Sequence, residues 1–188
     1  ILSTFASLSV NSAKNLITKF FSSSKVLGRD ENINFDSFLN LSTEDQFKEI
    51  ERLDKKNGVE DVWKAFVEKF KSQGGSTGNI HDVAHLIGSL IYKGKGFNGI
   101  TICSAEFAFG CFHGFLDSAF KDSLDDLLKA EEACGKLGTG GPFASCIHGI
   151  GHGVASYYSS SDLRGSLKSC LKLDQKSREY CFDGSFME

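Results

Sequence analysis

The segment CIHGIGHG carries two histidines, His148 and His152, four positions apart and surrounded by glycines. Side chains four residues apart lie on the same face of a helix, with about 5–6 Å between their Cβ atoms. Two imidazoles in this arrangement can bind one metal ion, and HxxxH spacing recurs in zinc sites for that reason. His81 and His85 have the same spacing. The sequence therefore predicts two pairs of metal-binding histidines, each pair on one helix.

A third candidate pair follows from a repeated pattern. The strings CFHGF, CIHGI and CFDGSF begin with cysteines that lie 35 residues apart. The third position of each string is occupied in turn by His113, His148 and Asp183. His113 has Asp117 four residues later, at the position that His152 holds one period on. Because equivalent positions of successive repeats project to one side of a stack, we expect these side chains to meet in a shared region.

These side chains form a set of nitrogen and oxygen ligands from several helices. The candidate metal ligands are His81, His85, His113, Asp117, His148, His152 and Asp183. Imidazole and carboxylate ligands suit zinc or iron. The set is larger than one tetrahedral ion needs, so it predicts two ions, or one ion together with catalytic groups. Asp82 and Glu106 are candidate hydrogen-bond partners for the outer imidazole N–H groups.

The elements that must position these residues are predicted to be helices. A period in the mid-thirties is typical of repeats made of two antiparallel helices. Apolar residues at helical offsets and capping signals predict helices over 42–57, 59–70, 80–93, 111–120, 123–134, 144–158 and 162–172, with a loop at GKLGTGGPFAS. We therefore expect an all-α fold, a compact α/α solenoid-like array of helical hairpins with a helical N-terminal cap.

The same pattern predicts the domain organisation. We expect residues 1–40 to form a partly disordered N-terminal segment, or the remainder of a targeting or linker sequence. Residues 41–188 are predicted to form one all-helical domain, with the cap over 41–75 and the repeat region over 76–188.

Glycines flank the histidines at positions where helices are expected. Gly114, Gly149, Gly151, Gly153 and Gly184 each cost a helix interior about 1 kcal/mol relative to alanine. Two explanations remain open. Either neighbouring helices approach closely at these positions, or a ligand needs space beside the imidazoles.

The cysteines of the repeat region form an even set of six. In a stack of antiparallel hairpins, the end of one unit lies near the start of the next, which favours the pairs Cys103–Cys111, Cys134–Cys146 and Cys170–Cys181. The rival pairs Cys111–Cys134 and Cys146–Cys170 would leave two cysteines without partners. Disulfides imply an oxidising compartment, so the sequence predicts an extracytoplasmic or secreted protein.

Composition narrows the classes of partner. The chain has 188 residues, a net charge of −3 and 24% charged residues, which gives no electrostatic reason to expect nucleic acid as a partner. It begins at Ile1, and the first residues are interpreted as the tail of a removed or truncated targeting segment, so a tether to a membrane through a missing N-terminal segment is a further expectation. The expected substrate is an unidentified small molecule or peptide.

Two functions of different classes fit this pattern. The first is a metal-dependent hydrolase or oxidoreductase with its ligands at the centre of the stack. It is similar in concept to deoxyhypusine hydroxylase, in which helical repeats supply histidine–acid dipeptides to two iron ions, and only His81-Asp82 resembles such a dipeptide here. The second is a non-catalytic module that binds a protein or peptide. It resembles the cysteine-bridged relatives of tetratricopeptide repeats in having one bridge per unit.

Overall fold

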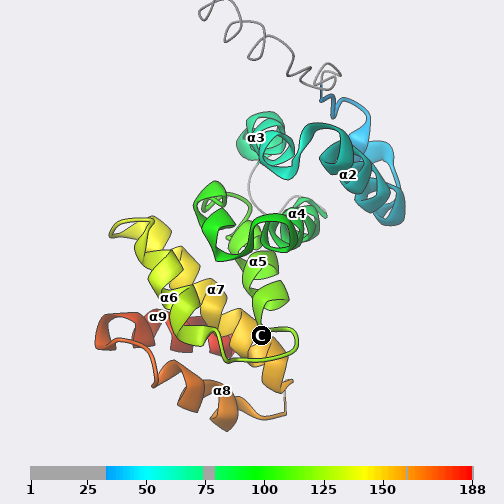
Figure 1. Ribbon diagram of the computed structural model, residues 1–188. Coiled ribbons are helices and arrows are strands. Elements are labelled where there is room, and N and C mark those ends of the chain that lie inside the picture. Colours follow the sequence, from blue (N-terminus) through cyan, green and yellow to red (C-terminus); the bar gives the residue numbers. More distant parts are fainter. Residues whose placement is uncertain (1–32, 74–78, 160, 188) are drawn as a thin grey trace, which may run out of the picture. The chain divides into compact units, whose positions relative to one another are not determined.

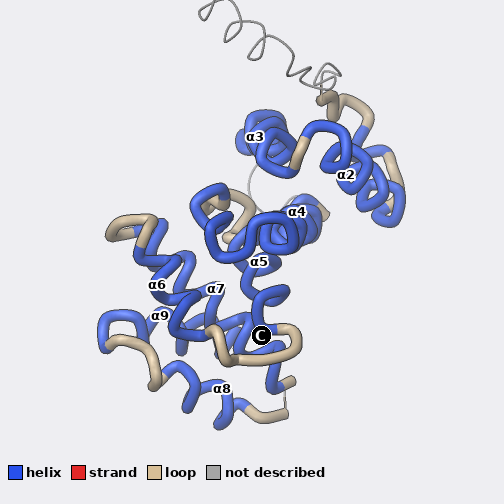
Figure 2. Tube along the Cα trace, in the orientation of Figure 1, coloured by secondary structure: helices blue, strands red, loops and turns tan. Residues whose placement is uncertain are grey.

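The computed structural model describes residues 33–73, 79–159 and 161–187 (Figure 1). Within these ranges the secondary structure comprises α-helices and short 3₁₀ helices, with no strand (Figure 2). The all-α class predicted from the sequence is confirmed. The described residues belong to one compact unit that begins at Ile33. Most of the predicted N-terminal segment, residues 1–32, lies outside the described residues.

Within the described residues the first α-helices are α2 (Thr43–Asn57) and α3 (Val59–Phe70), and both lie in the segment predicted as the helical N-terminal cap. The hydroxyl of Ser42 accepts a hydrogen bond from the backbone N–H of Asp45 at 3.2 Å, which caps the start of α2. Gly58 ends α2 and begins α3 with a φ of 87°, a conformation that glycine adopts without a steric penalty.

Residues before the predicted boundary at position 40 contribute to the core. Phe35 and Phe38 are almost fully buried. The ring of Phe35 contacts that of Phe66 at 5.6 Å between centroids, and the ring of Phe38 contacts that of Phe70 at 6.0 Å. This aromatic cluster fixes the segment before α2 onto α3.

The remaining helices follow in chain order. They are α4 (Ile80–Lys95), α5 (Gly110–Phe120), α6 (Leu127–Gly135), α7 (Gly141–Tyr158), α8 (Leu163–Cys170) and α9 (Gln175–Met187). The helix α4 packs on α5, α5 packs on α7, and α7 packs on α9, while the shorter α6 and α8 also contact α7. No helix in the described ranges has both the length and the apolar character needed to cross a membrane.

Two predicted boundaries were wrong. The helix α6 begins at Leu127 rather than near Ser123, because the Ser123 hydroxyl accepts a hydrogen bond from the N–H of Asp125 and forms a local turn instead. The helix α7 begins at Gly141, so the last five residues of the predicted loop GKLGTGGPFAS are helical. Pro142 favours this earlier start, because proline is well suited to the first turn of a helix.

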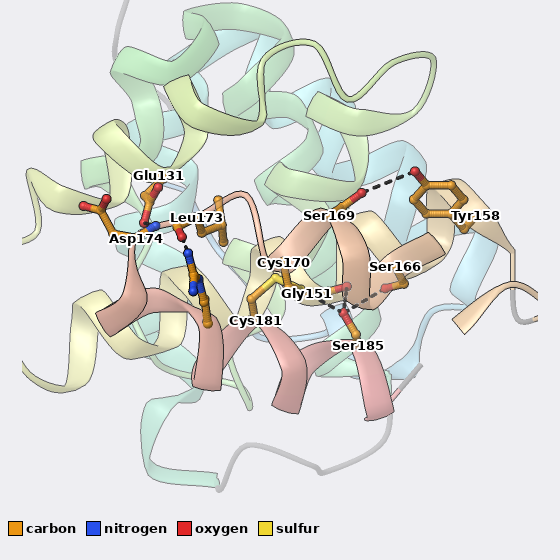
Figure 3. The surroundings of a disulfide bond; sticks show 11 residues. Glu131, Gly151, Tyr158, Ser166, Ser169, Cys170, Leu173, Asp174, Cys181 and Ser185 are labelled. Atoms are coloured by element: carbon orange, nitrogen blue, oxygen red, sulfur yellow. Dashed lines mark hydrogen bonds between the residues drawn. A yellow bond between two sulfur atoms is a disulfide. The ribbon is translucent and has the colours of Figure 1, made fainter. Parts of the chain in front are cut away.

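The cysteines pair as predicted, in three disulfides. Cys103–Cys111, Cys134–Cys146 and Cys170–Cys181 have Cα–Cα distances of 5.5, 5.6 and 5.6 Å. The third bond joins the end of α8 to α9, as Figure 3 shows. Beside it, the Ser185 hydroxyl donates a hydrogen bond to the carbonyl of Gly151 on α7 at 3.2 Å. These bonds hold α7, α8 and α9 together, and three disulfides are compatible with an oxidising compartment.

Glycines set the separation of the helices that carry the histidines. A Cβ atom on Gly114 would overlap the backbone carbonyl of His85, and one on Gly184 would overlap the carbonyl of His148. A Cβ atom on Gly153 would lie 2.9 Å from the backbone carbonyl carbon and oxygen of Leu116. Close helix approach, the first of the two explanations left open by the sequence, therefore accounts for these glycines.

This packing predicts a large effect of a single methyl group. We expect Gly114→Ala to destabilise the protein by about 3 kcal/mol or more, because the new Cβ meets backbone that cannot move without separating α4 from α5. Urea denaturation of the oxidised protein measures this loss. Gly94→Ala, in the neighbouring helix α4, is the matched control, because nothing lies within 4 Å of its Cβ. The free energy of unfolding of Gly94→Ala should exceed that of the wild-type protein by a few tenths of a kcal/mol or more. Equal stability of the two variants would contradict the prediction.

Candidate metal centre

All five histidines of the chain lie together where α4, α5 and α7 meet. His113 on α5 occupies the middle position. Its ring centroid lies 5.6 Å from that of His81 on α4 and 5.6 Å from that of His148 on α7. The convergence of imidazoles from separate helices, which the repeat spacing predicted, is present in the structure.

Each HxxxH pair brings two ring nitrogens close together. The Nε2 atoms of His81 and His85 are 3.1 Å apart, and the Nε2 atoms of His148 and His152 are also 3.1 Å apart. Two nitrogen ligands of one tetrahedral zinc ion, each at about 2.0–2.1 Å from it, are separated by roughly 3.3 Å. Both pairs therefore present nitrogens at a spacing that suits a shared ion.

His113 completes a group of three with either pair. The groups are His81, His85 and His113, and His113, His148 and His152, and within each the ligand atoms lie within 4.8 Å of one another. Three protein ligands and an open fourth position are the arrangement of catalytic zinc sites.

The outer nitrogens of two imidazoles are held by oxygen atoms. His81 Nδ1 donates a hydrogen bond to the carbonyl of Phe107 at 2.7 Å. His148 Nδ1 donates to a carboxylate oxygen of Asp183 at 3.1 Å. These contacts leave Nε2 as the acceptor nitrogen of each ring and fix its orientation, as second-sphere partners do for metal-ligating histidines.

Asp117 and Asp183, which the sequence suggested as direct ligands, lie behind imidazoles. Asp183 on α9 contacts the outer nitrogen of His148, and 70% of its side chain is exposed. A carboxylate oxygen of Asp117 lies 3.8 Å from Nδ1 of His85. Neither aspartate belongs to the two histidine groups. Asp82, suggested as an outer partner, is exposed on α4, and Oε2 of Glu106 is buried without a hydrogen-bond partner.

Burial keeps the central imidazole neutral. His113 is 5% exposed, and its Nε2 atom is buried without a hydrogen-bond partner. Burial, together with the four neighbouring imidazoles, lowers the pKa of His113 to about 2. Burial also lowers the pKa of His148, and the nearby Asp183 partly opposes that shift. Neutral imidazole is the form that binds a metal ion.

A left-handed turn before α5 contributes two groups that the sequence did not reveal. Phe107, Ala108 and Phe109 have φ values of 57°, 49° and 65°, which is uncommon for residues other than glycine. The turn directs the Phe107 carbonyl to His81 and places the ring of Phe109 5.7 Å from that of His148. Such backbone strain persists only where the surrounding structure enforces it. No glycine or asparagine marks these three positions, so sequence pattern alone could not have found the turn.

The low pKa of His113 predicts acid sensitivity of the metal-free protein. Between pH 6.5 and pH 2 the unfolded chain binds a proton at this imidazole, whereas the folded protein does not. The free energy of unfolding therefore falls as the pH drops below 6.5. This group alone should remove about 2 kcal/mol between pH 7 and pH 5.

Comparison with His113→Leu isolates that contribution, because leucine has a similar volume and does not titrate. Urea denaturation at both pH values, in the presence of a chelator, should show that wild-type protein loses about 2 kcal/mol more than the variant. Parallel losses in the two proteins would show that His113 is protonated in the folded state.

The arrangement provides a cluster of imidazole nitrogens, two of them oriented by outer hydrogen bonds, with an aromatic ring packed against His148. The spacing of these nitrogens is one that could hold a transition-metal ion. No protein family model matches the chain, and no curated protein or solved structure shows significant similarity to it. The function must therefore be inferred from the geometry of the histidine cluster.

Proposed function

We propose that this protein binds a divalent transition metal, zinc or iron, at the histidine cluster and uses it as a metal-dependent enzyme. One observation carries the proposal. Four imidazoles from α4 and α7 gather around His113 on α5, while oxygen atoms hold the outer nitrogens of His81 and His148. The inner nitrogens are thereby oriented toward one another.

The energetics of the metal-free cluster support metal binding over packing. A buried polar atom without a hydrogen-bond partner costs about 1–3 kcal/mol. Nε2 of His113 is such an atom, and it lies among four other imidazoles. A bound cation would use its lone pair and remove this penalty.

The architecture supports a repeat origin for the cluster. His113, His148 and Asp183 each precede a glycine, and Gly114 and Gly184 both sit against the backbone of a histidine on the neighbouring helix. We infer that the chain contains copies of one helical hairpin, each associated with one of the three disulfides. Each copy contributes an imidazole or a carboxylate to the centre of the cluster.

The expected reaction classes are hydrolysis and oxidation. When bound, the metal would activate water or oxygen, and the protein's imidazoles would hold it while Asp183 orients His148. The substrate would be a small molecule or peptide. The disulfides support an extracytoplasmic or secreted location.

Metal analysis of protein purified without a histidine tag tests the proposal. We expect stoichiometric zinc or iron in the oxidised protein, and loss of metal on His148→Ala or His152→Ala. A metal-free protein that takes up neither ion on addition, and whose stability those substitutions leave unchanged, would favour the non-catalytic binding module.

Asp183→Asn tests the role of the outer partners. We expect this variant to bind metal about 10–100-fold more weakly, because the amide is a poorer acceptor for the His148 N–H and carries no charge. Asp82→Asn, an exposed aspartate beside His81, is the matched control and should leave the affinity unchanged. Competition with a chromophoric chelator measures both. Equal affinities of the two variants would show that Asp183 has no role in metal binding.

A further inference from the structure

The two histidine groups differ in how far they are exposed to solvent. His113, His148 and His152 are 5%, 6% and 8% exposed, so the group on the α7 side is closed. His81 and His85 on α4 are only partly buried, and 33% of the His85 side chain is exposed. The group on the α4 side is therefore open to solvent along one edge.

The open edge borders a cavity. Asp117, which lies 3.8 Å from His85, lines a cavity of about 330 Å³ together with Ser118, Lys121, Ser156 and Tyr157. The Ser156 hydroxyl donates a hydrogen bond to Asp117 at 3.4 Å. Solvent and small solutes can thus reach the neighbourhood of His85, whereas the ring of Phe109 packs against His148 on the closed side.

The number and spacing of nitrogens suit two ions. Each HxxxH pair has its own Nε2 atoms 3.1 Å apart, one pair on each side of His113. Five imidazoles exceed the four ligands that one tetrahedral ion takes. A neutral imidazole has one acceptor nitrogen, so His113 can bind only one of the two ions, and the ion on the other side keeps two imidazole ligands.

Building on the proposed function, we propose that the cluster holds two ions of unequal accessibility. The inner ion, bound by His148 and His152 with His113, is closed in and exchanges slowly. The outer ion, bound by His81 and His85, exchanges rapidly with solvent and keeps a coordination position for water or a small anionic ligand. The outer ion is then the reactive one, and the inner ion maintains the centre.

Chelator-driven release of Co²⁺ from the oxidised full-length protein tests this assignment. Co²⁺ replaces zinc or iron and gives visible absorption that reports its ligands. We expect two ions per chain that leave in two phases, with the inner ion about 100-fold slower. Such a factor corresponds to a local opening that costs about 2.7 kcal/mol. Added azide should change the absorption of the fast-exchanging ion only.

Substitutions assign the phases to the groups. His85→Ala, on the half-exposed α4 side, should remove the fast phase and the azide response while the slow phase remains. His152→Gln should remove the slow phase, and circular dichroism verifies that the variant is folded. His81→Ala provides a second variant of the outer group and should behave as His85→Ala does.

The outcomes separate this inference from the proposed function. One ion per chain, two ions released at the same rate, or loss of the slow phase in His85→Ala would overturn the two-ion assignment and leave metal binding intact. Failure of the wild-type protein to bind Co²⁺ at all would instead refute the proposed function itself.

Discussion

We expect reduction of the three disulfides to unfold the metal-free protein at 25 °C. The bonds Cys103–Cys111, Cys134–Cys146 and Cys170–Cys181 close loops of 8, 12 and 11 residues. In the chain-entropy model each contributes about 2.7 kcal/mol, or about 8 kcal/mol in total. This is comparable to the entire stability of a typical domain, about 5–15 kcal/mol. Far-ultraviolet circular dichroism during titration with a phosphine reductant should show cooperative loss of helix.

A variant that lacks one of the three disulfides measures the contribution of a single bond. Replacing Cys170 and Cys181 together by serine removes one bond and should lower the free energy of unfolding by about 2.7 kcal/mol without unfolding the protein. Oxidised reductant at the same concentration serves as the control for solvent effects. A reduced protein that keeps its helical signal and its unfolding midpoint would show that the hydrophobic core alone maintains the fold.

If the protein binds metal as proposed, we expect His113→Leu to remove most of the stabilisation that the metal gives to the folded protein. A ligand that binds only the folded state adds about 4 kcal/mol at a free concentration 1,000-fold above its dissociation constant. For a protein of this size that raises the melting temperature by about 10 °C. His113 belongs to both histidine groups, so its loss removes a candidate ligand from each of them. Differential scanning calorimetry with and without zinc measures the shift.

The metal-free form of the same variant provides the control. Leucine fills a similar volume and removes the buried Nε2 atom that has no partner, so metal-free His113→Leu should be at least as stable as the metal-free wild-type protein at pH 7. A variant that is destabilised without metal would mean that His113 serves mainly in packing. A variant that retains the full metal-induced shift would place the site elsewhere.

The sequence predicted the helices best where apolar periodicity and caps agree. Ser42 and Gly58 mark both ends of α2, and the structure confirms them. The helices predicted from the sequence end at residue 172, so they do not include α9 (Gln175–Met187). This omission has a physical reason. The buried positions of α9 are Ser177, Cys181, Gly184 and Ser185, which are small and do not form an apolar stripe. Its packing depends on close backbone approach to α7, which hydropathy does not record.

The candidate site was also predictable only where it depends on the geometry of a single helix. The spacing of His81 and His85, and of His148 and His152, was sufficient to predict two pairs of facing imidazoles, because it depends only on helix geometry. The position of Asp183 behind His148 depends on how α9 is rotated against α7. Spacing along the chain carries no information about that rotation.

The left-handed stretch Phe107–Phe109 lies inside the ring closed by Cys103–Cys111. Without that covalent closure, nothing in the local sequence favours three successive residues at positive φ, and the carbonyl that sets the His81 tautomer would be free to turn away. We therefore expect the histidine cluster to assemble only after the Cys103–Cys111 bond has formed. For the exported metal-binding protein proposed above, the chain would then acquire its cation only after it reaches an oxidising compartment.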